Sequence, residues 1–165
     1  MKISNSLKFK LSAAVLGVLA LGLGSTSVFA AATTTFQVSA DVQATCLISA
    51  TGMAFGTYTG AIANATSALS VTCTNTSGYS IGLSAGTTSG ASDTARKMAG
   101  PGTDVLGYGL FSDSAHSKNW GQTVGTVSGT GNGSAQSITV YGQVPASQYV
   151  APGAYTDTIT ATITY

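Results

Sequence analysis

The sequence predicts an all-β protein with the architecture of a two-sheet sandwich, and its two ends carry the clearest signal. Over residues 36–45 apolar and polar side chains alternate, and over residues 156–165 threonine alternates with mostly apolar residues. Because side chains two positions apart lie on the same face of a strand, this alternation is typical of half-buried strands. Between the ends, runs rich in Thr, Val, Ile and Tyr are separated by dense turn signals, and none has a helical period.

The first 30 residues have the features of a secretory signal peptide. Three lysines precede an apolar stretch over residues 11–23, and Val28-Phe29-Ala30 matches a small-residue cleavage pattern. We expect cleavage after Ala30 and export of the remaining chain. The apolar stretch is too short for a membrane-spanning helix and no second one follows, so the mature chain is expected to have no membrane span.

Seven strands are expected in the chain that remains, each bounded by Gly, Pro, Ser or Asn signals. They cover residues 36–48, 53–58, 68–74, 79–84, 105–111, 137–144 and 155–165. Residues 85–103 and 112–133 are rich in Gly, Ser and Thr and are expected to form long exposed connections. In the last strand Asp157 shares the phase of Ile159 and Ile163. We therefore expect its carboxylate to point inward and to accept backbone hydrogen bonds.

Length and charge restrict the function. Cleavage of 30 residues from 165 leaves 135, the size of one domain. Three basic and five acidic residues remain, so the net charge is −2. A nucleic-acid partner requires a basic face and is not expected. So few charges also give weak electrostatic protection against self-association, which suits a subunit that polymerises.

The two cysteines, Cys46 and Cys73, are expected to form one disulfide, because they are even in number and lie in an exported chain. Closing a loop of this size stabilises a domain by roughly 3 kcal/mol in the loop-entropy model. Two cysteines and the single histidine, His116, make a poor metal-ligand set. Neither a metal nor another cofactor is expected.

The C-terminal alternation also predicts an open sheet edge. A sandwich closed by residues 155–165 has nothing left to cover its next edge, and an uncovered edge pairs readily with another chain. The strand-like segment near the N-terminus is suited to that pairing, which suggests a self-assembling structural protein. The alternative is that residues 36–42 form the first strand of their own sandwich. Residues 45–49 are apolar and strand-like enough to provide a first strand without them.

Short motifs follow one another along the chain in a characteristic order. Those before residue 110 are Phe55-Gly56-Thr57-Tyr58, Val71-Thr72-Cys73-Thr74, Tyr79-Ser80-Ile81-Gly82-Leu83, Arg96-Lys97-Met98 and Leu106-Gly107-Tyr108. Those after it are Leu110-Phe111-Ser112-Asp113, Trp120-Gly121, Tyr141-Gly142-Gln143-Val144-Pro145 and Gly153-Ala154-Tyr155-Thr156-Asp157-Thr158-Ile159. The ordered set covers nearly the whole mature chain and resembles the spore coat protein U family.

That family includes subunits of archaic chaperone-usher pili as well as a spore coat protein. The resemblance implies an incomplete immunoglobulin-like sandwich over residues 45–165 that lacks its last strand. A periplasmic chaperone lends a strand, and an outer-membrane usher exchanges it for the N-terminal extension, residues 31–44, of the next subunit. The implied donor residues are Phe36, Val38, Ala40 and Val42. The acceptor edge is expected at Ile159, Ala161, Ile163 and Tyr165, in a surface pilus that serves adhesion and biofilm formation.

Other classes of function are weighed against a pilus subunit. A secreted coat protein that completes its own sandwich fits the same family. A carbohydrate-binding module would use an aromatic surface of Trp120, Tyr108 and Tyr141, although packing in a core or interface is the commoner role of such residues. An enzyme is not expected: Asp113 and His116 lie in one polar run with serines, but a crowded loop supplies neither the placement nor the oxyanion site of a triad.

Overall fold

The computed structural model describes residues 29–165, and the chain divides into two compact units, Met1–Ser39 and Ala40–Tyr165. Nearly all of the predicted signal peptide lies outside the described residues. Residues 29–165 contain no helix, and therefore none that would cross a membrane. Their eight strands are β1 (Cys46–Ala50), β2 (Ala63–Cys73), β3 (Gly78–Leu83), β4 (Arg96–Ala99), β5 (Val105–Phe111), β6 (Val127–Thr130), β7 (Gln136–Val144) and β8 (Ala161–Thr164).

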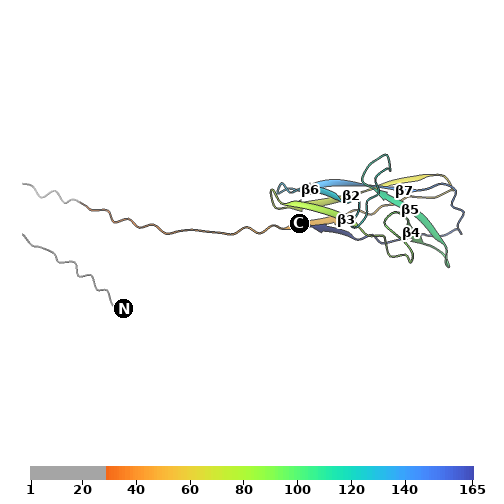
Figure 1. Ribbon diagram of the computed structural model, residues 1–165, viewed down its shortest axis with the longest axis horizontal. Coiled ribbons are helices and arrows are strands. Elements are labelled where there is room, and N and C mark those ends of the chain that lie inside the picture. The colour runs from red at the N-terminus through yellow and green to blue at the C-terminus, as the bar shows by residue number, and fades with distance from the viewer. Residues whose placement is uncertain (1–28) are drawn as a thin grey trace, which may run out of the picture. The chain divides into compact units, whose positions relative to one another are not determined.

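The strands form two antiparallel sheets, as the alternation predicts. Five strands pair in the order β1-β2-β7-β5-β4 and three in the order β6-β3-β8. Figure 1 shows strands running along the length of the domain, with β4 and β5 toward one end. Because β1 and β8 are both outermost, each has a strand neighbour on one side only. The two come into contact with each other, but no ladder joins them within the described residues.

The core consists of the inward-facing phase of each strand. On β5 and on residues 69–73 of β2 every second residue is buried, as expected for strands with one face against a core. The buried apolar residues are Leu69, Val71, Cys73, Tyr79, Ile81, Leu83, Leu106, Tyr108, Leu110, Trp120, Val140 and Val144. Trp120 enters from a loop, and its indole N–H donates to the Ile81 carbonyl at 2.8 Å. This satisfies the one polar atom of a fully buried side chain.

The predicted disulfide is confirmed. Cys46 and Cys73 are register partners in the ladder between β1 and β2, and their sulfur atoms are bonded. The bond therefore fixes one end of an edge strand that has only one neighbour. From Cys46 to Ala50, every residue of β1 has a register partner on β2.

Three strand predictions need correction. Residues 53–58 are extended but belong to no strand, because they cross the inner face of the five-stranded sheet and find no main-chain neighbour there. The strand predicted over residues 36–48 begins only at Cys46. The strand predicted over residues 155–165 is reduced to Ala161–Thr164, preceded by a single bridge between Thr156 and Ala99 of β4.

Two strands lie where long exposed connections were predicted. β4 lies within residues 85–103, and β6 lies within residues 112–133. The charge of Arg96 favours an exposed loop in the sequence, but the side chain is fully buried on β4. β6 pairs at the edge of β3 and has only four residues, which is too short a run for alternation to predict a strand.

Candidate subunit interface

The edge of β8 that faces away from β3 presents unpaired backbone groups. Ser84, which directly follows β3, donates its N–H to the Thr160 carbonyl at 2.9 Å. The backbone groups of Thr160 and of every second residue after it therefore point toward β3. Because backbone groups of an antiparallel strand point alternately to its two neighbours, Ala161 and Ile163 direct their N–H and C=O groups to the open side. This edge can therefore accept a further strand.

The side chains beside this edge are apolar and only half-buried. Ile159, Ala161 and Ile163 pack against the core but remain partly exposed. Ile48 of β1, across from them, also packs against the core and is also half-buried. We call this pair of facing edges, β1 and residues 159–165, the open seam. Its apolar row is a surface that one more amphipathic strand would cover.

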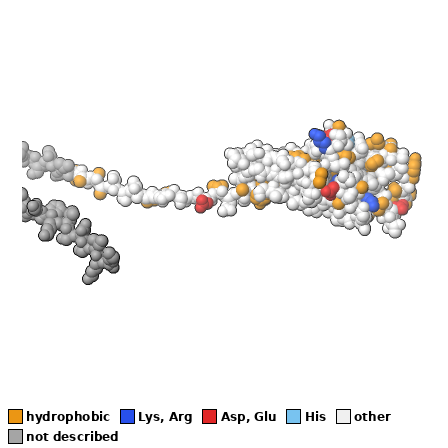
Figure 2. Space-filling view, in the orientation of Figure 1, with side chains coloured by type: hydrophobic (Ala, Val, Ile, Leu, Met, Phe, Trp, Pro, Cys, Tyr) orange, Lys and Arg blue, Asp and Glu red, His pale blue; other side chains and the backbone are white. Residues whose placement is uncertain are grey.

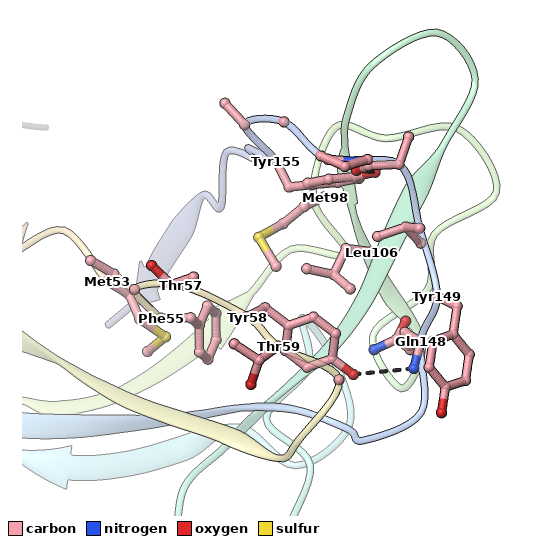
Figure 3. Close-up of a pocket in the computed structure, with 18 residues that line it drawn as sticks. Met53, Phe55, Thr57, Tyr58, Thr59, Met98, Leu106, Gln148, Tyr149 and Tyr155 are labelled. Carbon is pink, nitrogen blue, oxygen red and sulfur yellow. Dashed lines mark hydrogen bonds between the residues drawn. The ribbon is translucent and has the colours of Figure 1, made fainter.

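A pocket of about 960 Å³ lies between the segment that follows β1 and the segment that leads to β8. One wall is residues 53–60, which follow β1, and the other is residues 148–155, which lead toward β8. Figure 3 shows Phe55 and Tyr58 on one side, with Met98, Leu106 and Tyr155 across from them. In Figure 2 hydrophobic side chains gather toward the end of the domain where β4 and β5 lie. The pocket extends the apolar surface of the seam.

The wall formed by residues 53–60 is held by a side chain rather than by a ladder. Among the described residues, no backbone hydrogen bond involves the main chain of residues 53–59. Instead the Tyr58 hydroxyl donates to the Pro145 carbonyl at 2.6 Å and accepts the Gln148 N–H at 3.1 Å. The Phe55 ring packs edge-on against Tyr108, with centroids 6.1 Å apart. The main chain of this wall is thus free to pair.

Asp157 anchors the chain just before β8. Its Oδ1 accepts the Thr87 N–H at 2.8 Å, the Thr87 hydroxyl at 3.0 Å and the Thr158 N–H at 2.8 Å. Its Oδ2 accepts the Tyr108 hydroxyl at 2.7 Å. Burial acts to raise the pKa of Asp157, but these hydrogen bonds outweigh it and the pKa is lowered. Burial, aided by this bond, raises the pKa of Tyr108. The inward-pointing carboxylate predicted from the sequence is confirmed.

Arg96 is a second buried anchor behind the seam. Its guanidinium donates to four main-chain carbonyls, those of Ser84 (2.9 Å), Asp93 (2.6 Å), Leu83 (3.0 Å) and Trp120 (2.7 Å). Burial lowers the pKa of Arg96, although the group stays charged at any ordinary pH. The planar fork of donors ties β4 to the end of β3 and to the loop that carries Trp120.

A family model, the Spore Coat Protein U domain, matches residues 32–162. The chain belongs to this family. It is also similar to Protein U of Myxococcus xanthus, with 36% identity over an alignment of 171 residues that covers 93% of this chain and 96% of the relative. The resemblance noted in the motifs is therefore confirmed at the level of the family.

Among solved structures, a chaperone–subunit complex is similar in fold to this Spore Coat Protein U domain. It is the chaperone-tip adhesion subunit pre-assembly complex, CsuC-CsuE, from the archaic chaperone-usher Csu pili of Acinetobacter baumannii. The TM-score is 0.59 at 21% sequence identity, and the match covers 75% of this chain. It covers 40% of the matched chain, so this chain spans less than half of that length. The fold is the predicted all-β, incomplete immunoglobulin-like sandwich.

The predicted donor residues of this family member lie outside any strand. Phe36, Val38 and Val42 are 85%, 81% and 84% exposed, and Ala40 is exposed as well. No strand occurs between residues 29 and 45. Of the predicted acceptor residues, Ala161 and Ile163 lie on β8, while Ile159 precedes it and Tyr165 follows it. The division into residues 31–44 and 45–165 and the roles of these residues stay predictions.

Sequence reasoning missed the pocket. The sequence predicts a strand over residues 53–58, but nothing in this run indicates that the opposite wall of the pocket is residues 148–155. Met98 was placed in an exposed loop, and it lines this pocket together with Leu106. The usable signal was the three large apolar side chains of Met53, Phe55 and Tyr58 within one short run.

The aromatic residues considered for carbohydrate binding do not form one surface. Trp120 and Tyr108 are buried, and only Tyr141 is half-exposed. His116 packs edge-on against Phe111, with ring centroids 5.3 Å apart, and lies 6.4 Å from Tyr141.

The polar run considered for catalysis stabilises its own loop. Asp113 accepts the hydroxyl of Ser117 at 2.6 Å and the Lys118 N–H at 2.8 Å. The His116 N–H donates to the Asp113 carbonyl at 3.1 Å, which closes the turn. Within residues 29–165 no hydrogen bond joins the side chains of Asp113 and His116, and no cluster of three His, Cys, Asp or Glu side chains is placed to hold a metal.

Proposed function

We propose that the chain is a structural subunit of a chaperone-usher surface pilus, and that the N-terminal extension of one copy completes the sandwich of the next. The observation that carries the proposal is the open seam: two outermost strands meet without a ladder, and a half-buried apolar row lies between them. An exposed segment with the matching alternation, residues 36–42, is present in the same chain. Family membership and the fold of the Csu complex support the same conclusion.

The energetics suit strand donation. Burial of Phe36, Val38 and Val42 would contribute roughly 5 to 9 kcal/mol before ordering costs. A domain is stable by only about 5 to 15 kcal/mol, so a subunit without a donor strand is marginal. This supports a periplasmic chaperone as the first partner and an outer-membrane usher as the second. The contact between subunits is head-to-tail, so it propagates into a fibre on the cell surface, where it would serve adhesion and biofilm formation.

A coat protein is the second candidate, and the likeness to Protein U favours it. A version that completes its own sandwich would bury Phe36 and Val38 in its own seam. β1 begins at Cys46 and pairs with β2 without these residues, which favours donation to another copy instead. A coat built from copies linked by the same strand remains compatible with the seam.

The test compares the full-length mature protein with a variant that lacks residues 31–42, both expressed in an oxidising compartment. Size-exclusion chromatography and electron microscopy report the assembly state. A control lacking only residues 31–34 keeps the apolar row. We expect SDS-resistant ladders or fibres from the full-length and control chains and none from the long truncation. A stable full-length monomer that unfolds on truncation would establish self-completion and refute the proposal.

A further inference from the structure

The apolar pocket beside the open seam is lined by both methionines that follow Met1 in the chain. Met53 lies on the wall formed by residues 53–60, and Met98 belongs to β4. Both side chains pack against the core but stay half-buried, so part of each is open to the pocket. Figure 3 shows the Met53 sulfur beside the Phe55 ring and the Met98 sulfur in the space between the two walls. The thioethers of the domain are therefore gathered in one cavity.

Backbone contacts place each methionine next to one edge of the seam. Met53 lies on the segment that directly continues β1. Met98 precedes Ala99, which exchanges two 2.9 Å main-chain hydrogen bonds with Thr156. Thr156 in turn comes shortly before Ile159, where the half-buried apolar row of the seam begins. The two methionines thus extend the two edges that an incoming strand would contact.

The Met53 side chain fills a gap that a glycine leaves on the inner face of β7. Val140, Gly142 and Val144 share this face and are buried. A Cβ on Gly142 would collide with the Met53 sulfur and would lie 2.9 Å from the Phe55 ring. An unbranched thioether adapts to an irregular surface, which suits a groove that receives one strand and then another.

Methionine is also the apolar side chain that a mild oxidant makes polar. The sulfur lone pair attacks one oxygen of hydrogen peroxide, an S–O bond forms as the O–O bond breaks, and the departing hydroxide takes up a proton to give water. The sulfur loses two electrons and the peroxide gains them, so the product is methionine sulfoxide. The new oxygen is costly to bury unless it accepts a hydrogen bond.

The pocket is poorly suited to a sulfoxide once a strand covers it. The hydroxyl groups of Tyr58 and Tyr155 and the side-chain amide of Gln148 already donate to main-chain carbonyls. The free donors of this wall include the main-chain N–H groups of residues 53–59, which an incoming strand would also use. A sulfoxide therefore either adds an unpaired polar atom to the interface or competes with the strand for its donors.

We propose that Met53 and Met98 are a site of oxidative modification, at which peroxide converts the thioethers to sulfoxides and so prevents the open subunit from accepting a strand. The loss of strand acceptance rests on the proposed function, whereas the modification itself does not. A strand bound in the seam restricts access to the pocket, and oxidation follows access. An open subunit is thus sensitive to peroxide, and a completed subunit is protected.

The first measurement compares oxidation rates in the full mature chain. Monomer and polymer fractions from size-exclusion chromatography are treated with hydrogen peroxide, quenched with free methionine and analysed by peptide mass spectrometry. The chain unfolded in urea gives the rate of an unprotected thioether. We expect Met53 and Met98 of the monomer to react within about tenfold of that rate, and those of the polymer at least about tenfold more slowly than those of the monomer. A chain that forms no polymer even without peroxide would refute the proposed function, and the monomer rates would still decide the modification site.

The second measurement determines whether the sulfoxides themselves block assembly. Monomer oxidised before assembly should give at least about fivefold less polymer than untreated monomer, because the groove has become polar. The double variant Met53→Leu, Met98→Leu should polymerise equally with and without peroxide, since leucine keeps the apolar volume and has no sulfur. This variant retains Trp120, the tyrosines and the disulfide, so it controls for oxidation elsewhere in the chain.

Biosynthetic replacement of methionine by norleucine repeats the test with an unbranched side chain, in case the leucine variant misfolds. The norleucine chain should also assemble equally with and without peroxide. Unmodified Met53 and Met98 in monomer at a peroxide dose that fully oxidises the unfolded chain would overturn the proposal. A normal polymer yield from fully oxidised monomer, or an equal loss of polymer in the norleucine chain, would overturn it as well.

Discussion

The Tyr108 hydroxyl donates a 2.7 Å hydrogen bond to the carboxylate of Asp157, and this bond links β5 to the segment that leads into β8. The two strands belong to different sheets. Thr87 adds two further donors to the same carboxylate and Thr158 adds a third. One side chain thus positions the beginning of the open seam. The stability of the domain and the shape of its interface therefore depend on the same carboxylate.

Asp157→Asn is expected to destabilise the domain and to remove part of its acid sensitivity. The folded state lowers the pKa of Asp157 below its ordinary value of 3.8. The contribution of the group is therefore present above that value and is lost as pH falls through the lower folded value. We expect a loss of about 1 to 2 kcal/mol at neutral pH, since the variant keeps an acceptor but no charge. Thermal unfolding from pH 7 to pH 2 measures both effects.

Asp113→Asn is the matched control for that experiment. Hydrogen bonds from Ser117 and Lys118 also lower the pKa of Asp113, but the carboxylate lies in a surface loop and is partly exposed to solvent. Screening by water makes such contacts weak, so the unfolding curve should change little. Equal acid sensitivity of the Asp157→Asn variant and the unmodified chain would show that Asp157 does not carry the effect.

Arg96→Met is expected to destabilise the domain by about 3 to 5 kcal/mol. The change leaves four carbonyl groups in or near the core without their donor, and each such group is costly when buried. Lys97→Met is the control, because the neighbouring side chain forms no such bonds and should change stability by less than about 0.5 kcal/mol. Urea unfolding followed by circular dichroism compares them. Similar midpoints for both variants would contradict the anchoring role of Arg96.

Tyr58→Phe is expected to loosen the wall of the apolar pocket. The variant keeps the ring but loses the bonds to the Pro145 carbonyl and the Gln148 N–H, at a cost of about 1 kcal/mol. Hydrogen exchange of the Gln148 and Ser147 amides should speed up, because Gln148 N–H loses its acceptor and Ser147 N–H donates to the Gly60 carbonyl at the end of the loosened wall. Tyr149→Phe, at a ring that is 91% exposed, should leave exchange and stability unchanged. Unaltered exchange in both variants would show that side-chain packing alone holds residues 53–60 in place.

Val38→Asp is expected to abolish polymer formation while a chaperone-bound monomer is still obtained. A carboxylate in the apolar phase of the donor segment would have to be buried in the seam of the next copy. Ser39→Asp places the same charge one residue later, in the phase that faces solvent, and should polymerise normally. Electron microscopy of periplasmic and surface fractions distinguishes them. Fibres at normal yield from the Val38→Asp variant would refute the donor role.

Several features could be predicted from the sequence because they depend on local pattern. The alternation along β2, β5, β7 and β8 follows from the two-residue period of a strand, and it reveals the all-β class. Asp157 could be placed facing inward because it shares the phase of Ile159. The disulfide followed from two cysteines in an exported chain. Each of these inferences needs only neighbours in sequence or a count.

Other features depend on segments that are distant in sequence, and only the tertiary structure decided them. Arg96 looks like a loop cation in the sequence, yet four carbonyls from three segments make its burial favourable. The pocket forms because residues 53–60 and 148–155 meet around Met98, and no local period encodes that meeting. The sequence by itself therefore determined which faces are apolar. The fold decided which of these faces remain uncovered, because coverage depends on the partners that distant strands supply.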